Sequence, residues 1–116
     1  FEGTPAQMMA SLAKLAALPG DTLMYCGHEY TLANLRFALA VEPGNPALHA
    51  RQQREQAKRD RGAPTVPSRM DEERATNPFL RAAEPAVYAA AAAHAGRPLV
   101  DAVDAFATLR EWKNGF

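Results

Sequence analysis

The chain has 116 residues, of which 47% are hydrophobic and 22% are charged, and these are the proportions of a folded soluble domain rather than a disordered or fibrous chain. Its 13 Lys and Arg residues balance its 13 Asp and Glu residues, so no overall field attracts nucleic acid or an anionic membrane. The single cysteine excludes an internal disulfide, and no apolar run reaches the ~20 residues of a membrane span. No signal-peptide pattern opens the chain, so we expect a cytoplasmic protein.

The first predicted helix spans residues 5–18. Thr4 and Gln7 have the spacing of a capping box, and Pro5 suits the first helical position because its missing N–H would have no partner there. Apolar residues then recur at helical spacing until Gly20 ends the pattern.

A strand is predicted over residues 22–26, TLMYC, which carry bulky apolar side chains on both faces. It is the one convincing strand pattern in the sequence. Because the backbone groups of a strand need neighbouring strands, we expect its partners to lie in a part of the protein outside this chain, or in a second copy.

The rest of the chain is predicted to be mainly helical. Helix signals give helices over 31–41, 46–61, 85–95 and 102–114, and the proline-rich stretch 62–83 is expected to be an extended connection with one helical turn at 70–74. The helix over 46–61 has few apolar residues and is expected to be largely solvated, with Glu55 at pairing distance from Lys58 and Arg59. Its basic residues have no interleaved aromatic residues, so we expect no nucleic-acid surface there.

His28 follows the predicted strand. Zinc needs four protein ligands, or three and a water, and the spacing of Cys26, His49 and His94 does not complete such a site. From the residues alone, His28 is either a structural residue at a strand end or one ligand of a metal site whose other ligands precede this chain.

Two further features also allow two interpretations. Tyr30 precedes the Thr31 cap and can pack on Leu35 as a hydrophobic staple, or its hydroxyl can reach a ligand. In the last helix, Arg110 and Lys113 lie one turn apart on one face. Cations near a helix C-terminus are favoured by the helix dipole, so this pair is either solvated or an anion site.

Four stretches, spread in order over nearly the whole chain, carry a resemblance to a known family: FEGTPAQM, YCGHEYTLANLRFALAVEPGNPAL, VPS with EERATNPFLR, and ATLREWKNGF. Together they resemble the C-terminal part of the hydroxyacylglutathione hydrolase (glyoxalase II) family, in the metallo-β-lactamase superfamily. The resemblance implies an α+β fragment that is mainly α. Residues 1–28 would be the last helix and strand of a metallo-β-lactamase-type αβ/βα sandwich, and residues 29–116 a helical domain that binds the glutathione thioester.

The resemblance also implies roles for individual residues. His28 matches the last ligand of a site for two divalent metal ions, zinc or else iron or manganese, whose THxHxDH motif and other ligands would precede this chain. Tyr30 matches a glutathione contact, and Arg110 and Lys113 match the basic pair that binds the glycine carboxylate of glutathione. Phe1 departs from the family, which often has a tyrosine there whose hydroxyl can assist the ligand.

The implied activity is hydrolysis of S-D-lactoylglutathione and other 2-hydroxyacylglutathiones by a metal-bound hydroxide. We expect the chain to be an inactive fragment of such an enzyme, with weak or no metal binding, that self-associates to cover faces left open by the absent domain. An alternative from another class is a non-enzymatic helical domain that binds a partner chain through Leu32, Leu35, Leu39, Trp112 and Phe116.

Overall fold

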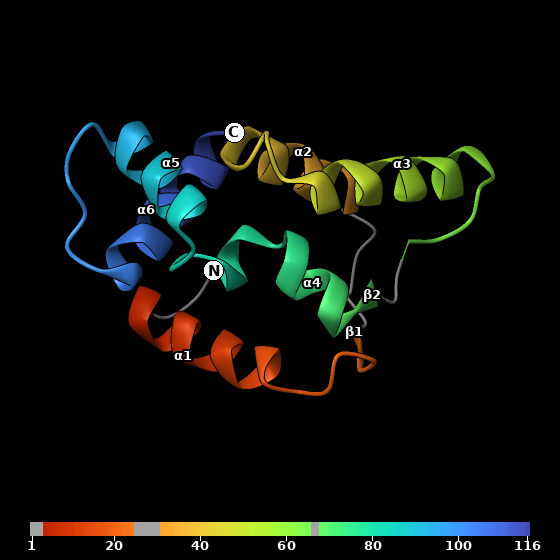
Figure 1. The fold of residues 1–116 in the computed structure, drawn as a ribbon, viewed down its shortest axis with the longest axis horizontal. Coiled ribbons are helices and arrows are strands. Elements are labelled where there is room, and N and C mark those ends of the chain that lie inside the picture. Colours follow the sequence, from red (N-terminus) through yellow and green to blue (C-terminus); the bar gives the residue numbers. More distant parts are fainter. Residues whose placement is uncertain (1–3, 25–30, 66–67) are drawn as a thin grey trace.

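A computed structural model describes residues 4–24, 31–65 and 68–116 (Figure 1). The described residues are mainly helical. Their helices are α1 (Pro5–Ala16), α2 (Thr31–Val41), α3 (Pro46–Asp60), α4 (Met70–Thr76), the 3₁₀ helix η1 (Pro78–Leu80), α5 (Pro85–Ala95) and α6 (Ala102–Gly115), and their strands are β1 (Leu23–Met24) and β2 (Ser68–Arg69). No described helix has the length and apolar character needed to cross a bilayer.

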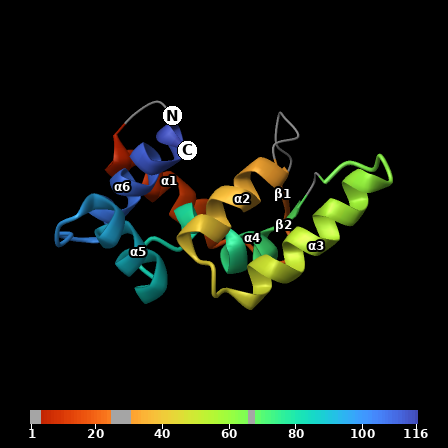
Figure 2. The same cartoon turned by 90° about the horizontal axis from the view of Figure 1, so that it is seen from above.

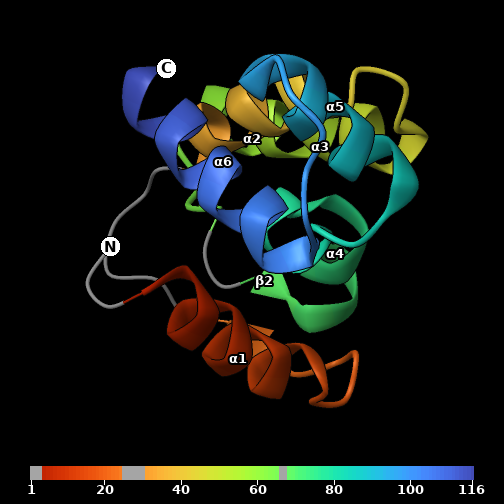
Figure 3. The same cartoon turned by 90° about the vertical axis from the view of Figure 1, so that its left-hand side faces the viewer.

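The short helix α4 occupies the middle of the molecule. Figure 1 shows α1 on one side of α4 and the antiparallel pair α2 and α3 on the other. Helices α5 and α6 pack together at one end, and α3 extends toward the opposite end, which gives principal dimensions of 43 × 26 × 23 Å (Figure 2). The end-on view in Figure 3 places α1 below α6 and α4, as the packing of α1 on both helices requires.

The helix starts predicted from the sequence are confirmed. At α1, the Thr4 hydroxyl accepts from the Gln7 N–H at 3.1 Å, and the Gln7 side chain accepts from the Thr4 N–H at 3.0 Å. Asn45 caps α3, and Asp101 caps α6. Each cap satisfies backbone donors that the first helical turn leaves without a partner.

The predicted strand over 22–26 needs correction. The structure describes it through Met24, and its partner is β2 of the same chain, with Leu23 opposite Arg69 and Met24 opposite Ser68. The expectation of one strand with partners outside the chain is therefore wrong for these residues, and Leu23 is 51% exposed rather than buried. A two-residue strand beside prolines has no period-2 pattern that sequence analysis can detect.

The main core joins α2, α5 and α6. Its buried residues are Phe37, Val41, Ala82, Val87, Ala91, Ala105, Phe106 and Leu109. Met8, Met9 and Leu12 of α1 pack against this core, so the expectation that the apolar face of α1 lies open is wrong for these three side chains. This part of α1 packs against α6 and η1 of the same chain, while Leu15 is 39% exposed.

The partner-binding surface of the alternative hypothesis is largely used inside the chain. Leu35 is buried in a second cluster between α2 and α3, where Leu32 and Leu39 pack against it. Trp112 packs on the main core, while Phe116 is 63% exposed. This distribution does not favour a helical interaction domain, and self-association of the chain stays a prediction.

The expectation that α3 is largely solvated is wrong for one face. Arg51 and Glu55 are buried, and the predicted pair between Glu55 and Lys58 is present at 3.5 Å. Arg59 donates to the Ala63 carbonyl instead. Few apolar residues mark this face because its buried positions other than Leu48 are charged, and charges are buried when they find partners.

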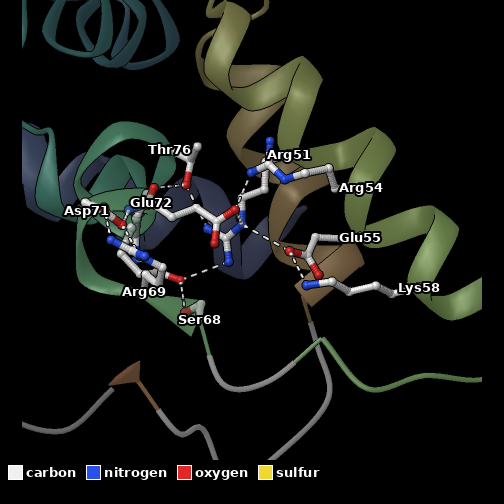
Figure 4. A network of polar contacts seen from close by, with 11 residues as sticks. Arg51, Arg54, Glu55, Lys58, Ser68, Arg69, Asp71, Glu72 and Thr76 are labelled. Atoms are coloured by element: carbon white, nitrogen blue, oxygen red, sulfur yellow. Dashed lines mark hydrogen bonds and ion pairs between the residues drawn. The ribbon is translucent and has the colours of Figure 1, made fainter. Parts of the chain in front are cut away.

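The partners of Arg51 come mainly from α4, while Glu55 pairs with Arg51 and Lys58 of α3 itself (Figure 4). The Arg51 guanidinium donates to the Thr76 hydroxyl at 2.7 Å and to a Glu73 carboxylate oxygen at 3.0 Å. The Ser68 hydroxyl donates to the same Glu73 oxygen at 2.7 Å. Because the Arg51 side chain is only 6% exposed, this network holds α3 against α4 with little competition from water.

We predict that Arg51→Leu lowers the free energy of unfolding by about 3 kcal/mol, because it leaves the partly buried Glu73 carboxylate without its cation. The matched control is Arg54→Leu on the same helix. Arg54 pairs with Glu72 but its side chain is 54% exposed, so its loss should cost less than about 1 kcal/mol. Urea denaturation of the two variants checks this order, and equal losses would contradict it.

The connection from α5 to α6 is fixed by one carboxylate. Gly96 ends α5 in the left-handed conformation, with φ of 69°. Arg97 then donates two hydrogen bonds to Asp104, at 2.7 and 2.9 Å, and the Val100 N–H donates to Asp104 at 3.0 Å. The Arg97 hydrogen bond, followed by that from Val100, lowers the pKa of Asp104 to about 2.

This lowered pKa predicts an acid-dependent loss of stability. The folded-state pKa of Asp104 is below its ordinary value of 3.8, so its stabilising effect is complete above that value and is lost as the pH falls through about 2. The stability advantage of the wild type over Asp104→Asn should therefore be constant above pH ~5 and decline between pH ~4 and ~2. Thermal unfolding across this range checks it, and a constant advantage down to pH ~2 would contradict it.

Candidate functional site

The structure describes two of the four predicted site residues. His28 and Tyr30 lie outside the described residues, as does Phe1, so their predicted roles stay predictions. Arg110 and Lys113 lie one turn apart near the end of α6, as their spacing predicts. Both side chains are half-buried at the edge of the core.

The rotation of α6 about its axis sets the direction of this basic pair. Phe106 and Leu109 of α6 are fully buried in the main core. In an α-helix, positions three and four apart share a face, so the neighbours Arg110 and Lys113 are carried to the border between core and solvent. A basic pair at such a border can keep its charged ends accessible while its carbon stems pack on apolar groups.

Lys113 lies against an aromatic ring of α2. Its Nζ is 5.9 Å from the centroid of Phe37, within the range in which an ammonium is attracted to the face of a ring. Lys113 forms no ion pair with any side chain in the described ranges. Its charge is thus held near α2 and is not neutralised by a described carboxylate.

The Phe37 ring is itself fixed by other rings. Trp112 and Phe116 meet it edge-on, with centroids at 5.6 and 5.5 Å, and Phe79 stacks on it at 6.1 Å. His94 of α5 stacks on Trp112 at 4.3 Å. Nothing in the sequence indicated Phe37 as the partner of Lys113, since no spacing rule connects α2 with α6.

The chemistry of the basic pair favours carboxylate binding. A guanidinium can hold both oxygens of a carboxylate through two parallel hydrogen bonds, and an ammonium adds a mobile point charge. The nearby negative end of the α6 dipole stabilises both cations in the absence of ligand. The arrangement therefore provides two positive groups near each other at a partly apolar border.

A second charged region is less suited to an anion. A shallow depression of about 430 Å³ lies between α3 and α4 and is lined by Arg54, Arg69, Asp71 and Glu72, among others. Arg54 pairs with Glu72, and Arg69 pairs with Asp71. Each cation in this lining thus already has a carboxylate partner.

No metal centre is assembled by the part of the chain that the structure describes. In residues 4–24, 31–65 and 68–116, no three His, Cys, Asp or Glu side chains converge where an ion could bind. His49 hydrogen-bonds the Pro43 carbonyl at 2.6 Å, and His94 stacks on Trp112. The described residues alone therefore do not fit a dinuclear metal site.

Comparison with known proteins decides the family. The family model described as hydroxyacylglutathione hydrolase C-terminus matches residues 29–116, which include α2 through α6 and the basic pair. The chain belongs to this family. The resemblance found in the sequence motifs is thereby confirmed.

Similar proteins carry the same name. The chain is 63% identical, over 114 residues, to a hydroxyacylglutathione hydrolase of Alkalilimnicola ehrlichii, a match that covers 98% of this chain and 44% of that protein. It is 60% identical over 116 residues to one of Cupriavidus taiwanensis, covering 100% of the chain and 43% of the relative. A third hydroxyacylglutathione hydrolase, from Xylella fastidiosa, is 56% identical to the chain over 116 residues, and the match covers 100% of this chain and 45% of that protein. The chain thus spans less than half the length of these relatives.

Proposed function

We propose that the protein containing this chain is a hydrolase of glutathione thioesters, with S-D-lactoylglutathione as the substrate and D-lactate and glutathione as the products. The observation that carries the proposal is the family match over residues 29–116, together with relatives at 56–63% identity that are named hydroxyacylglutathione hydrolase. The cytoplasmic location predicted from the sequence belongs to the same proposal, and the single cysteine supports it.

The proposal divides the chain into two functional parts. Residues 1–28 would be the end of a metallo-β-lactamase-type catalytic domain, and residues 29–116 the substrate-binding domain. The start of the family match at residue 29 supports this boundary. The described part of the first segment, 4–24, packs on the helices rather than standing apart, so the two parts would share one rigid interface.

The described residues assemble no metal site themselves. The metal ions of this proposal therefore need ligands from outside the described residues. His28 would be one ligand, because a neutral imidazole is a common metal ligand and the end of a strand restrains its backbone. When bound, two divalent ions, zinc in this proposal, would supply hydroxide at neutral pH.

The present chain would bind and orient the glutathione half of the substrate. Arg110 would hold its glycine carboxylate through two hydrogen bonds, Lys113 would add a second positive charge, and Tyr30 would contact the peptide. The half-buried border at the end of α6 supports this role, since charge interactions strengthen where water is partly excluded. The leaving thiol has an ordinary pKa of about 8.5, so it departs as a thiolate without a strong general acid.

We predict that Arg110→Ala in the full-length protein raises KM for S-D-lactoylglutathione about tenfold or more and changes kcat less than about threefold. The reason is that the lost hydrogen bonds bind the peptide end equally in the ground state and the transition state. Steady-state kinetics, with and without a chelator, provide the measurement.

The matched control is Arg59→Ala, an exposed arginine on α3 far along the chain from the basic pair. It should leave both constants unchanged. An unchanged KM in Arg110→Ala would retire the carboxylate assignment. A wild-type protein without thioesterase activity would contradict the proposed function itself.

A further inference from the structure

We propose that Phe37 is a positioning residue for substrate binding: its ring holds the Lys113 ammonium in place for the substrate carboxylate without neutralising it. This inference rests on the proposed function. In this proposal the position of Lys113 on α6 depends on Phe37 of α2. The affinity for substrate therefore depends on the aromatic packing of the core.

The first step is that Phe37 offers a rigid surface. Phe37 is only 1% exposed, and three aromatic rings surround it. These neighbours are Phe79, Trp112 and Phe116, with centroids 5.5 to 6.1 Å from that of Phe37. A ring fixed on several sides cannot turn away, so its face keeps a constant position relative to α6.

The second step is that Lys113 needs a partner to be ordered. A lysine side chain has four rotatable bonds, and ordering it costs up to about 2 kcal/mol of conformational entropy. Within the described residues its Nζ makes no ion pair and lies 5.9 Å from the Phe37 centroid. The ring face therefore restrains the ammonium before substrate arrives, and binding pays less of the ordering cost.

The third step is that a ring and a carboxylate differ as partners for a cation. Lys58 on α3 pairs with Glu55 at 3.5 Å, so its charge is compensated within the chain. The quadrupole of a ring attracts the ammonium but carries no net charge. Lys113 thus keeps its full positive charge for an incoming anion, whereas Lys58 does not.

The experiment is a double-variant cycle in the full-length enzyme. Phe37→Leu keeps an apolar side chain and removes the ring face, so KM for S-D-lactoylglutathione should rise about two- to fivefold while kcat changes less than about twofold. In a Lys113→Met background, Phe37→Leu should cause no further rise in KM. A merely structural role of Phe37 would give the same factor in both backgrounds.

The matched control is Phe106→Leu. Phe106 is equally buried in the same core and meets Phe79 at 5.4 Å, whereas the described ring under the Lys113 ammonium is that of Phe37. This variant should lose comparable stability and leave KM unchanged. An equal rise in KM for Phe106→Leu and Phe37→Leu would overturn the assignment.

A second variant covers the case in which Phe37→Leu does not fold. A ring-fluorinated phenylalanine at position 37 keeps the shape of the side chain and withdraws negative charge from the ring face, so KM should rise as it does for leucine. An unchanged KM on fluorination overturns the inference.

If Lys113→Met raises KM but the Phe37 variants act equally in both backgrounds, the inference fails and the proposed function stands. A wild type that does not hydrolyse the thioester overturns both.

Discussion

The guanidinium of Arg74 ties the first described segment of the chain to the rest of the molecule. It donates to the carbonyls of Ala16 and Leu18, at 2.7 and 2.8 Å, where α1 ends and its last carbonyls lack helical partners. Gly20 allows the approach, since a Cβ there would lie 3.0 Å from both the Arg74 guanidinium and the Asp71 Cβ. The Asp71 N–H also donates to the Gly20 carbonyl at 2.9 Å, just before β1 pairs with β2. One arginine and one glycine thus form the contact of α1 with α4, beside the packing of α1 on α6 and η1.

The same seven-residue helix that carries Arg74 also holds α3. On that side α4 offers Thr76 and Glu73 to the buried Arg51, as Figure 4 shows for the surrounding network. Because α4 bonds α1 through one set of side chains and α3 through another, it fixes both relative to the core that α6 completes. In the proposed enzyme, this rigidity would hold the segment ahead of His28 at a constant position relative to the basic pair of α6. Catalytic and binding groups on separate elements need such support to act on one substrate.

Local features of the fold could be predicted from the sequence, and distant contacts could not. The capping box of Thr4 and Gln7 and the cap at Asp101 depend on residues three apart, so their spacing predicted both helix starts. The pairing of β1 with β2 and the burial of Arg51 depend on residues far apart in sequence, for which no periodicity exists. The family match confirms the resemblance to the family, and the roles of Arg110 and Lys113 that the resemblance implies stay predictions. The contact of Lys113 with Phe37 required the structure, because it joins α6 to α2.

Hydrogen exchange of the backbone amides tests most directly whether α4 joins residues 4–24 to the helices. The experiment compares the wild type with Arg74→Met and with a control variant, Arg69→Met. Arg69 is a suitable control because it pairs with Asp71 on the surface and its side chain is 57% exposed. Arg74→Met should speed exchange over residues 13–24 and leave α5 and α6 protected, while Arg69→Met should exchange like the wild type. Equal exchange over residues 13–24 in all three proteins would contradict this expectation.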